Sequence, residues 1–160
     1  MVLKNLLGTT AAVTVSAIVG AIASADTKSL WYRTLRKPDF QPPAIAFPVM
    51  WTALHADIAG TSAVVLDRLE DDAEKRRRFR VSLGTNLALN SAWTWVFFRS
   101  HKLGPAVAVA GVLTLSTLDL VRQAGAVRRS AGWALIPYAL WCGFATVLSA
   151  AIWYRNPAKK

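Results

Sequence analysis

The sequence predicts an all-α membrane protein in which one domain, residues 1–160, forms a bundle of five transmembrane helices. Composition is the first reason, because 54% of the residues are hydrophobic and 18% are charged, whereas soluble domains carry about 25% charged residues. Length is the second reason. About 20 apolar residues cross a bilayer as a helix, so this chain has room for at most five or six spans and for no sizeable soluble domain.

The expected helices are five long stretches that each hold at most one charged residue: residues 5–25, 40–66, 81–98, 103–121 and 130–154. Backbone groups in lipid must be hydrogen-bonded within the protein, which allows only helices or a closed barrel. Stretches of this length exclude barrel strands. We therefore expect a multi-pass integral membrane protein.

The first stretch has two interpretations. Lys4, the apolar run and the small residues 23–25 before Asp26 fit a secretory signal with a cleavage site. The four later spans favour a retained helix, which gains partners to pack against. Small residues at four-residue spacing, which let membrane helices pack closely, support the second interpretation. We therefore expect residues 1–25 to remain as the first helix.

Two groups of small residues predict close helix contacts, either within the bundle or between two copies of the chain. They are Ala12, Ser16 and Gly20 in the first stretch, and the pairs Gly104–Ala108 and Ala106–Ala110 in the fourth. From these groups we expect a homodimer.

The net charge of +10 does not indicate nucleic-acid binding, because the basic residues lie between apolar runs rather than on one face of a folded module. Residues 67–80 begin acidic and end basic, which predicts a solvated linker whose basic end meets anionic headgroups. Nucleic acid is the alternative partner for this segment, but no binding motif accompanies it. The expected partner is the lipid bilayer. Ten basic residues on one side and nine on the other leave the orientation open.

Motifs for metal binding and for common catalytic mechanisms are missing from the sequence. Cys142 is the single cysteine, and His55 and His101 are the only histidines, so no zinc cluster is expected. There is no phosphate-binding loop and no nucleophile elbow. We expect no metal site and no required cofactor.

The segment that joins the first two helices predicts a stiff, ordered loop, because Pro38, Pro42 and Pro43 prevent a long continuous helix. It is too apolar for a solvated linker, since it contains Trp31, Tyr32, Leu35 and Phe40. Two interpretations are open: the loop folds over the helix ends, or its aromatic residues form an interfacial belt.

Helical spacing places aromatic and hydrogen-bonding side chains together on three helices, as a pocket for a flat, mainly apolar ligand would require. These residues are Pro48, Trp51, Thr52 and His55; Asn86, Asn90, Trp93 and Phe97; and Tyr138, Trp141, Cys142, Ala145, Leu148 and Ser149. The alternative is ordinary helix packing, in which asparagines join helices within the membrane.

Three ionisable residues inside the spans are candidates for function. His55 has three possible roles: it donates to a ligand, it binds the metal of a tetrapyrrole, or it is a satisfied core histidine. Asp57 lies two residues away and points to another face, which argues against a direct pair. Asp119 is expected to pair with Arg122, three residues further along the helix.

Ordered motifs across all five spans resemble the translocator protein family, also called the tryptophan-rich sensory proteins, TspO or the peripheral benzodiazepine receptor. The residues that carry the resemblance are Trp31, Tyr32, Leu35, Lys37, Pro38, Pro42, Pro43, Phe47, Pro48, Trp51 and Thr52; residues 90–93 with Phe97 and Phe98; and residues 137–141 with residues 144–148.

The resemblance implies a five-helix bundle whose loop between helices one and two caps a cavity for porphyrins and, in eukaryotic members, for cholesterol and benzodiazepine-type drugs. With His55 and Asn86 added, the ligand-binding residues that it suggests are Trp51, His55, Asn86, Asn90, Trp93, Tyr138, Trp141, Phe144, Ala145 and Leu148. The lid residues are Trp31, Lys37, Pro42 and Pro43.

The chain departs from the family pattern at several positions of the pocket and lid. His55 stands where the family usually has tyrosine, Asn86 where it has glutamine, and Ser149 where it has asparagine. Asp39 and Phe40 stand where some bacterial relatives carry tryptophans. Ligand identity and photochemistry depend most on these positions.

The resemblance leads to the hypothesis of a tetrapyrrole receptor or carrier, with porphyrin or heme as ligand and a role in sensing or stress response, in a bacterial cell membrane. Arg33, Arg36 or Lys37 would pair with the propionates. One alternative is a light-dependent porphyrin-degrading enzyme with Trp51 and Trp141 as catalytic residues. The other is a lipid- or sterol-binding scaffold or transporter subunit.

Overall fold

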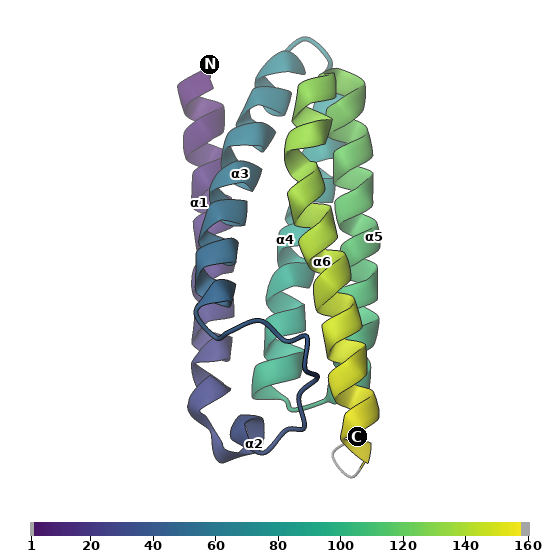
Figure 1. Ribbon diagram of the computed structural model, residues 1–160. Helices are drawn as coiled ribbons and strands as arrows, with labels where there is room; N and C mark the ends of the chain where they lie inside the picture. Colours follow the sequence, from purple (N-terminus) through teal and green to yellow (C-terminus); the bar gives the residue numbers. More distant parts are fainter. Residues whose placement is uncertain (1, 158–160) are drawn as a thin grey trace.

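The computed structural model describes residues 2–157, which form five long helices and three short helical segments (Figure 1). The long helices are α1 (Val2–Ser24), α3 (Ala46–Arg68), α4 (Ala73–Thr94), α5 (Leu103–Val127) and α6 (Arg129–Arg155). The short segments are a 3-10 turn, η1 (Ala25–Lys28), a single helical turn, α2 (Leu30–Arg33), and a π-helical turn, η2 (Trp95–Arg99). No strand occurs within residues 2–157.

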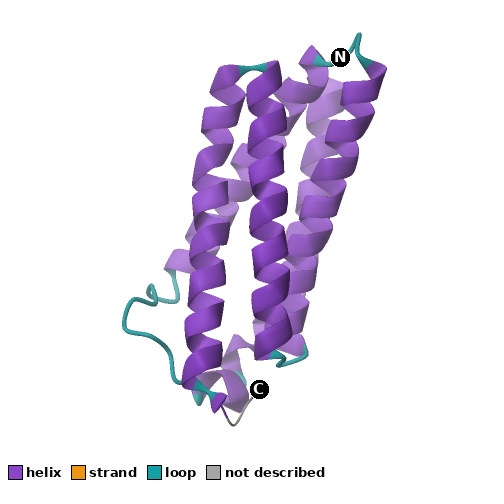
Figure 2. Cartoon of the chain, turned by 90° about the vertical axis from the view of Figure 1, so that its right-hand side faces the viewer, coloured by secondary structure: helices purple, strands orange, loops and turns teal. Residues whose placement is uncertain are grey.

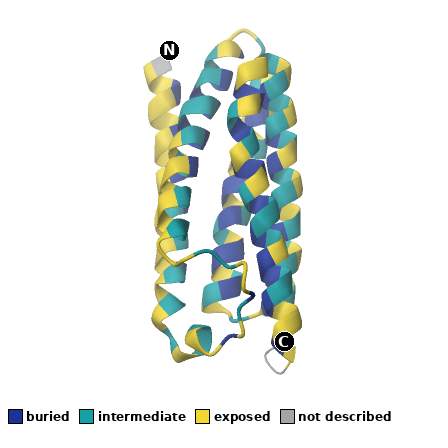
Figure 3. Ribbon diagram, viewed as in Figure 1, coloured by how far each residue is buried: buried dark blue, intermediate teal, exposed yellow. Residues whose placement is uncertain are grey.

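The long helices run up and down beside one another as one bundle (Figures 1 and 2). α1 packs on α3 and α4, α5 packs on α4 and α6, and α3 packs on α6. The α3–α4 and α5–α6 connections lie at one end. α2, the proline-containing loop and the α4–α5 connection lie at the other, which we call the α2 end. Buried residues gather on the inward faces, and α1 is the most exposed helix (Figure 3).

Four of the five long helices are long and apolar enough to cross a membrane: Leu3–Lys28, Ala46–Arg68, Leu103–Val127 and Arg129–Arg155. α4 is the exception. Its first turns carry the basic residues 75–80, and Asn86 and Asn90 lower the hydropathy of its second half. The structure therefore supports an all-helical membrane protein with four candidate spans, and the fifth span stays a prediction.

The prediction that residues 67–80 form a linker is wrong for most of the segment. α3 continues to Arg68 and α4 begins at Ala73, so only residues 69–72 connect the two helices. Asp72 starts α4 as an N-cap, because its Oδ1 accepts a hydrogen bond from the Lys75 backbone N–H at 3.0 Å. The hydrogen bonds from Lys75 lower the pKa of Asp72. The cap lets the basic run continue as helix.

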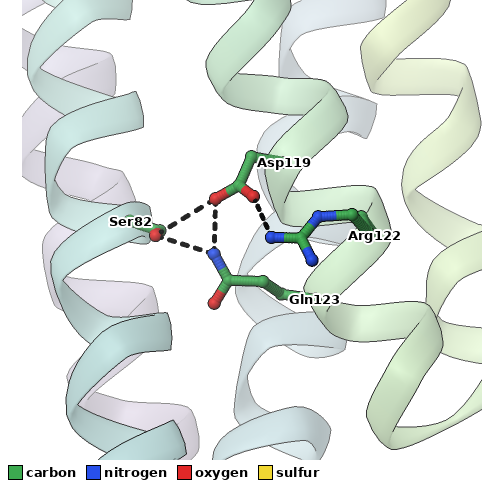
Figure 4. Close-up of polar contacts among 4 residues, drawn as sticks. All are labelled: Ser82, Asp119, Arg122 and Gln123. Atoms are coloured by element: carbon green, nitrogen blue, oxygen red, sulfur yellow. Dashed lines mark hydrogen bonds and ion pairs between the residues drawn. The ribbon is translucent and has the colours of Figure 1, made fainter.

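A polar cluster joins α4 to α5 (Figure 4). Arg122 donates to Asp119 at 2.7 Å, which confirms the expected pair. Gln123 donates both to Asp119 and to Ser82 of α4. Because the carboxylate already has partners on both helices, the cluster holds the α4–α5 register without an uncompensated charge.

Two of the three small residues of α1, Ser16 and Gly20, pack within the bundle, whereas Ala12 is exposed. The Ser16 hydroxyl donates to the Leu87 carbonyl of α4 at 3.1 Å, and a Cβ on Gly20 would lie 3.4 Å from the Thr94 hydroxyl. In α5, Ala106 and Ala110 are buried and Gly104 lies beside Trp153, whereas Ala108 is exposed. These contacts agree with the interpretation that the small residues pack helices within one bundle. The homodimer stays a prediction.

The α5–α6 hairpin depends on Gly132, because an alanine Cβ there would lie 2.7 Å from the Gly125 Cα and 3.2 Å from the Val121 carbonyl. Backbone cannot yield as a flexible side chain can, so we expect Gly132→Ala to cost about 1–3 kcal/mol of stability. The measurement is the thermal unfolding midpoint in detergent. Gly143→Ala is the control, since nothing lies within 4 Å of its Cβ position. Equal midpoints for the two variants would contradict this packing.

Candidate functional site

A cavity of about 620 Å³ lies toward the α2 end of the bundle, and α1, α3, α4 and α6 supply its walls. η1, α2, the loop before α3 and η2 complete the lining. The lining is predominantly apolar, with a few hydroxyl, amide and imidazole groups. Pockets for small organic ligands have this size and this character.

Five of the predicted ligand-binding residues line the cavity: Trp51, His55, Asn90, Trp93 and Leu148. Trp51 is central to the aromatic wall. Its ring centroid lies 5.5 Å from that of His55 and 6.5 Å from that of Trp93. The Trp93 indole N–H donates to the Ser149 hydroxyl at 3.3 Å, which fixes the indole against α6. The wall is therefore held by contacts between three helices.

The other five predicted ligand-binding residues lie outside the lining: Asn86, Tyr138, Trp141, Phe144 and Ala145. Trp141 supports Trp51 from behind, with ring centroids 6.5 Å apart and planes at 86°. Phe144 in turn packs on Trp141 at 5.4 Å. In this conformation Trp141 and Phe144 pack behind the aromatic wall. Direct contact of a ligand with any of the five residues stays a prediction.

A buried hydrogen-bond network supports the cavity wall from within the bundle. The Tyr138 hydroxyl donates to Asn86 Oδ1 at 2.7 Å and accepts from Asn90 Nδ2 at 3.3 Å. Asn86 also donates to the Thr117 hydroxyl of α5 at 2.9 Å. The network joins α4, α5 and α6, and Asn90 connects it to the cavity.

His55 is a polar residue of the wall, and one of its two ring nitrogens has no hydrogen-bond partner among the described residues. Its Nε2 is buried and has no hydrogen-bond partner among residues 2–157. A buried polar atom without a partner costs free energy, which a polar ligand atom or a local rearrangement can recover. This finding favours ligand contact over a satisfied core histidine, and the role of His55 stays a prediction.

The π-helical turn η2 contributes two neighbouring aromatic residues, Phe97 and Phe98, to the lining. The Ser100 backbone N–H donates to the Trp95 carbonyl five residues earlier, at 2.8 Å. The wider turn changes the angle between successive side chains. An ideal α-helix would place these two residues about 100° apart, so spacing alone did not predict Phe98 as a wall residue.

The predicted lid residues do not line the cavity, although their neighbours Tyr32, Gln41 and Ala44 do. Trp31 stacks on His101 at 4.0 Å, and the His101 ring lies 2.7 Å from an Asp26 carboxylate oxygen. These contacts tie the start of the loop to the α4–α5 connection.

The remaining predicted lid residues lie at the loop surface. The Lys37 ammonium lies 4.0 Å from the centre of the Tyr32 ring, and partial burial lowers the pKa of Lys37. Burial also raises the pKa of the Tyr32 hydroxyl, so Tyr32 stays neutral near neutral pH. Pro42 is half-buried and Pro43 is exposed.

Sequence reasoning missed the contribution of α1, which lines the cavity with Ser16, Ala17, Gly20, Ala21 and Ser24. The available signal was the run of small residues at helical spacing, which we interpreted only as a packing surface. Small side chains also leave space beside a helix. That space is part of the cavity.

Tyr138→Phe tests the buried network, because it leaves Asn86 Oδ1 and Asn90 Nδ2 without their partner at the centre of the bundle. We expect a loss of about 1–2 kcal/mol of stability, measured as a lower thermal midpoint in detergent. Tyr154→Phe is the matched control, since Tyr154 is 82% exposed. If both variants melt like the parent protein, the network does not support the wall.

Comparison with known proteins matches residues 9–155 to the TspO/MBR family. Protein CrtK of Rhodobacter capsulatus is 29% identical over 90% of this chain and 89% of its own length. The tryptophan-rich sensory protein of Cereibacter sphaeroides is 30% identical over 83% and 79%. The human translocator protein is 30% identical over 79% and 75%. With a family match that covers most of α1 and all of the other four long helices, the chain belongs to the TspO/MBR family of membrane proteins.

Proposed function

We propose that this protein binds a tetrapyrrole, either porphyrin or heme, as a membrane receptor or carrier with a role in sensing or stress response. The observation that carries the proposal is the aromatic wall around Trp51 in a cavity of about 620 Å³. A flat aromatic ligand gains about 0.5–1.5 kcal/mol per offset ring contact beyond the burial of its surface.

The polar groups of the cavity suit a ligand that is apolar over most of its area. Asn90, Ser149 and His55 lie on the wall among aromatic side chains and can orient such a ligand by a few hydrogen bonds. The resemblance to the translocator protein family implies porphyrins as ligands, which supports a tetrapyrrole over other flat ligands.

Charge at the α2 end supports an anionic ligand. The described residues at this end include seven Lys or Arg residues and two Asp residues, namely Lys28, Arg33, Arg36, Lys37, Arg99, Lys102 and Arg155 against Asp26 and Asp39. Basic groups beside a cavity raise the local concentration of anions. Arg33, Arg36 or Lys37 would pair with the propionates of a porphyrin.

We infer that residues 34–45 act as a lid over the cavity, because Gln41 and Ala44 line it and Leu35 is 6% exposed among core residues.

We also infer that α4 crosses the membrane as a fifth span, since its neighbours α1 and α5 are candidate spans and it packs along both. The homodimer and the bacterial cell membrane belong to the same proposal.

Trp51→Ala tests the cavity as the porphyrin site. It removes the central ring of the wall, and we expect protoporphyrin affinity to fall at least about tenfold, the equivalent of one lost ring contact. The measurement is a titration in detergent that follows tryptophan quenching and the Soret band. Trp133→Ala is the control, because Trp133 is 63% exposed on the outside of the bundle. If Trp51→Ala binds protoporphyrin as tightly as the parent protein, the porphyrin site is not this cavity. If the parent protein shows no saturable binding, the alternative of a scaffold with a lipid-filled cavity is favoured.

A second candidate function is light-dependent porphyrin oxidation, which the contact between the Trp51 and Trp141 rings favours. Trp51 would give an electron to the excited porphyrin, which passes it on to dissolved dioxygen. The Trp51 radical, which Trp141 lies close enough to share, would then take an electron back from the porphyrin, so that dioxygen is the oxidant overall.

The double variant Trp51→Phe with Trp141→Phe tests this chemistry, because phenylalanine keeps an aromatic ring but is far harder to oxidise than tryptophan. We expect the Soret band of bound protoporphyrin to decay under light in the parent protein and to persist in the double variant. Trp133→Phe controls for general photodamage. Equal decay in all three proteins would exclude a role for these tryptophans.

A further inference from the structure

The lid is joined to the end of α6 by one buried side chain, Asn156. Its Oδ1 accepts a hydrogen bond from the Arg36 backbone N–H at 3.0 Å, and its Nδ2 donates to the Arg36 carbonyl at 3.0 Å. Nδ2 also donates to the Ile152 carbonyl at 2.7 Å, so the carboxamide is oriented by its own helix. Asn156 thus satisfies both backbone polar groups of one lid residue from 120 residues away in the sequence.

Neighbouring contacts hold the same short part of the lid. Leu35 is 6% exposed and packs in the core beside the aromatic wall. The Arg155 guanidinium donates to the Lys37 carbonyl at 3.3 Å. Residues 35–37 are therefore held between the core and the end of α6.

The part of the lid that follows is mostly exposed, and it touches α6 through the Asp39–Arg155 ion pair at 4.0 Å and the Phe40–Phe144 ring contact at 6.3 Å. Asp39 and Phe40 are exposed, as are residues 43–45, whereas Gln41 and Pro42 are half-buried. Gln41 and Ala44 belong to the cavity lining. The anchored residues 35–37 therefore lie just before the residues that face the cavity.

We propose that Asn156 is the positioning residue of the lid: it holds the Arg36 backbone in the closed arrangement and thereby sets how long a ligand stays in the cavity. The part concerning the ligand rests on the proposed function. Asn156 itself is not in the cavity lining, so it acts through the lid.

Burial makes this contact effective. Asn156 is 6% exposed, and water competes poorly for the two Arg36 groups while the carboxamide covers them. Without the carboxamide, both backbone groups lose the protein partner that holds them in the closed arrangement. Loss of the two bonds should therefore favour local opening at this site without unfolding the bundle.

The first experiment measures lid opening without any ligand, as hydrogen exchange of the amides in residues 34–41. For Asn156→Ala we expect exchange about tenfold faster than in the parent protein, with exchange in α4 and α5 unchanged, which corresponds to the net loss of one to two hydrogen bonds. Asn5→Ala is the matched control. Asn5 is also 6% exposed and also joins distant segments, through Arg76 at 3.1 Å, but at the opposite end of the bundle.

Unchanged exchange of residues 34–41 in Asn156→Ala would overturn the proposal, and so would equally faster exchange in Asn5→Ala. Faster exchange throughout the chain would also overturn it, because Asn156 would then be a general structural residue. Faster exchange confined to the lid would support it.

The second experiment measures the dissociation rate constant of protoporphyrin by stopped flow in darkness. We expect an increase of about tenfold for Asn156→Ala and no change for Asn5→Ala. Local lid exchange with an unchanged dissociation rate would overturn the role in ligand retention. If the parent protein binds no porphyrin, the proposed function fails, and hydrogen exchange alone decides whether Asn156 positions the lid.

Discussion

The hydrogen bonds of Tyr138 with Asn86 and Asn90 are the constraint on which the site depends. A hydroxyl and two carboxamides buried in an apolar bundle inside a membrane have no water to bond, so they must be satisfied by one another. Thr117 extends the same network to α5. The relative positions of α4, α5 and α6 follow from this requirement, and the aromatic wall is built on α3, α4 and α6.

α1 and α3 complete the cavity by a different principle. α3 contributes the large ring of Trp51, which packs against rings from α4 and α6. α1 contributes small side chains, and its large apolar residues, such as Ile18 and Ile22, are exposed on the outside of the bundle. Close packing needs both sides of an interface to fill the space between them. Where α1 offers only small residues opposite bulky ones, a cavity remains.

The loop before α3 is stiffened by its own prolines and is attached to the bundle by a residue outside the loop. Pro38, Pro42 and Pro43 restrict its backbone and remove hydrogen-bond donors, so it cannot form a helix that packs by itself. Its attachment comes from the C-terminal end of α6 through Asn156. The departures from the family pattern at Asp39 and Phe40 fall in the part of the loop that this anchor leaves exposed.

The sequence by itself determined the helical membrane fold and the aromatic residues at its centre, because the length of an apolar run reflects the bilayer and helical spacing shows which side chains share a face. Trp51, Asn90 and Trp93 were predicted in this way and line one cavity. Only the tertiary structure decided which faces border space and which are packed, since periodicity does not identify the neighbour of a face. For the same reason, helical spacing could not show that Trp141 lies outside the cavity lining. It also could not show the role of Asn156, because its partner Arg36 is distant in the sequence and close only in the folded bundle.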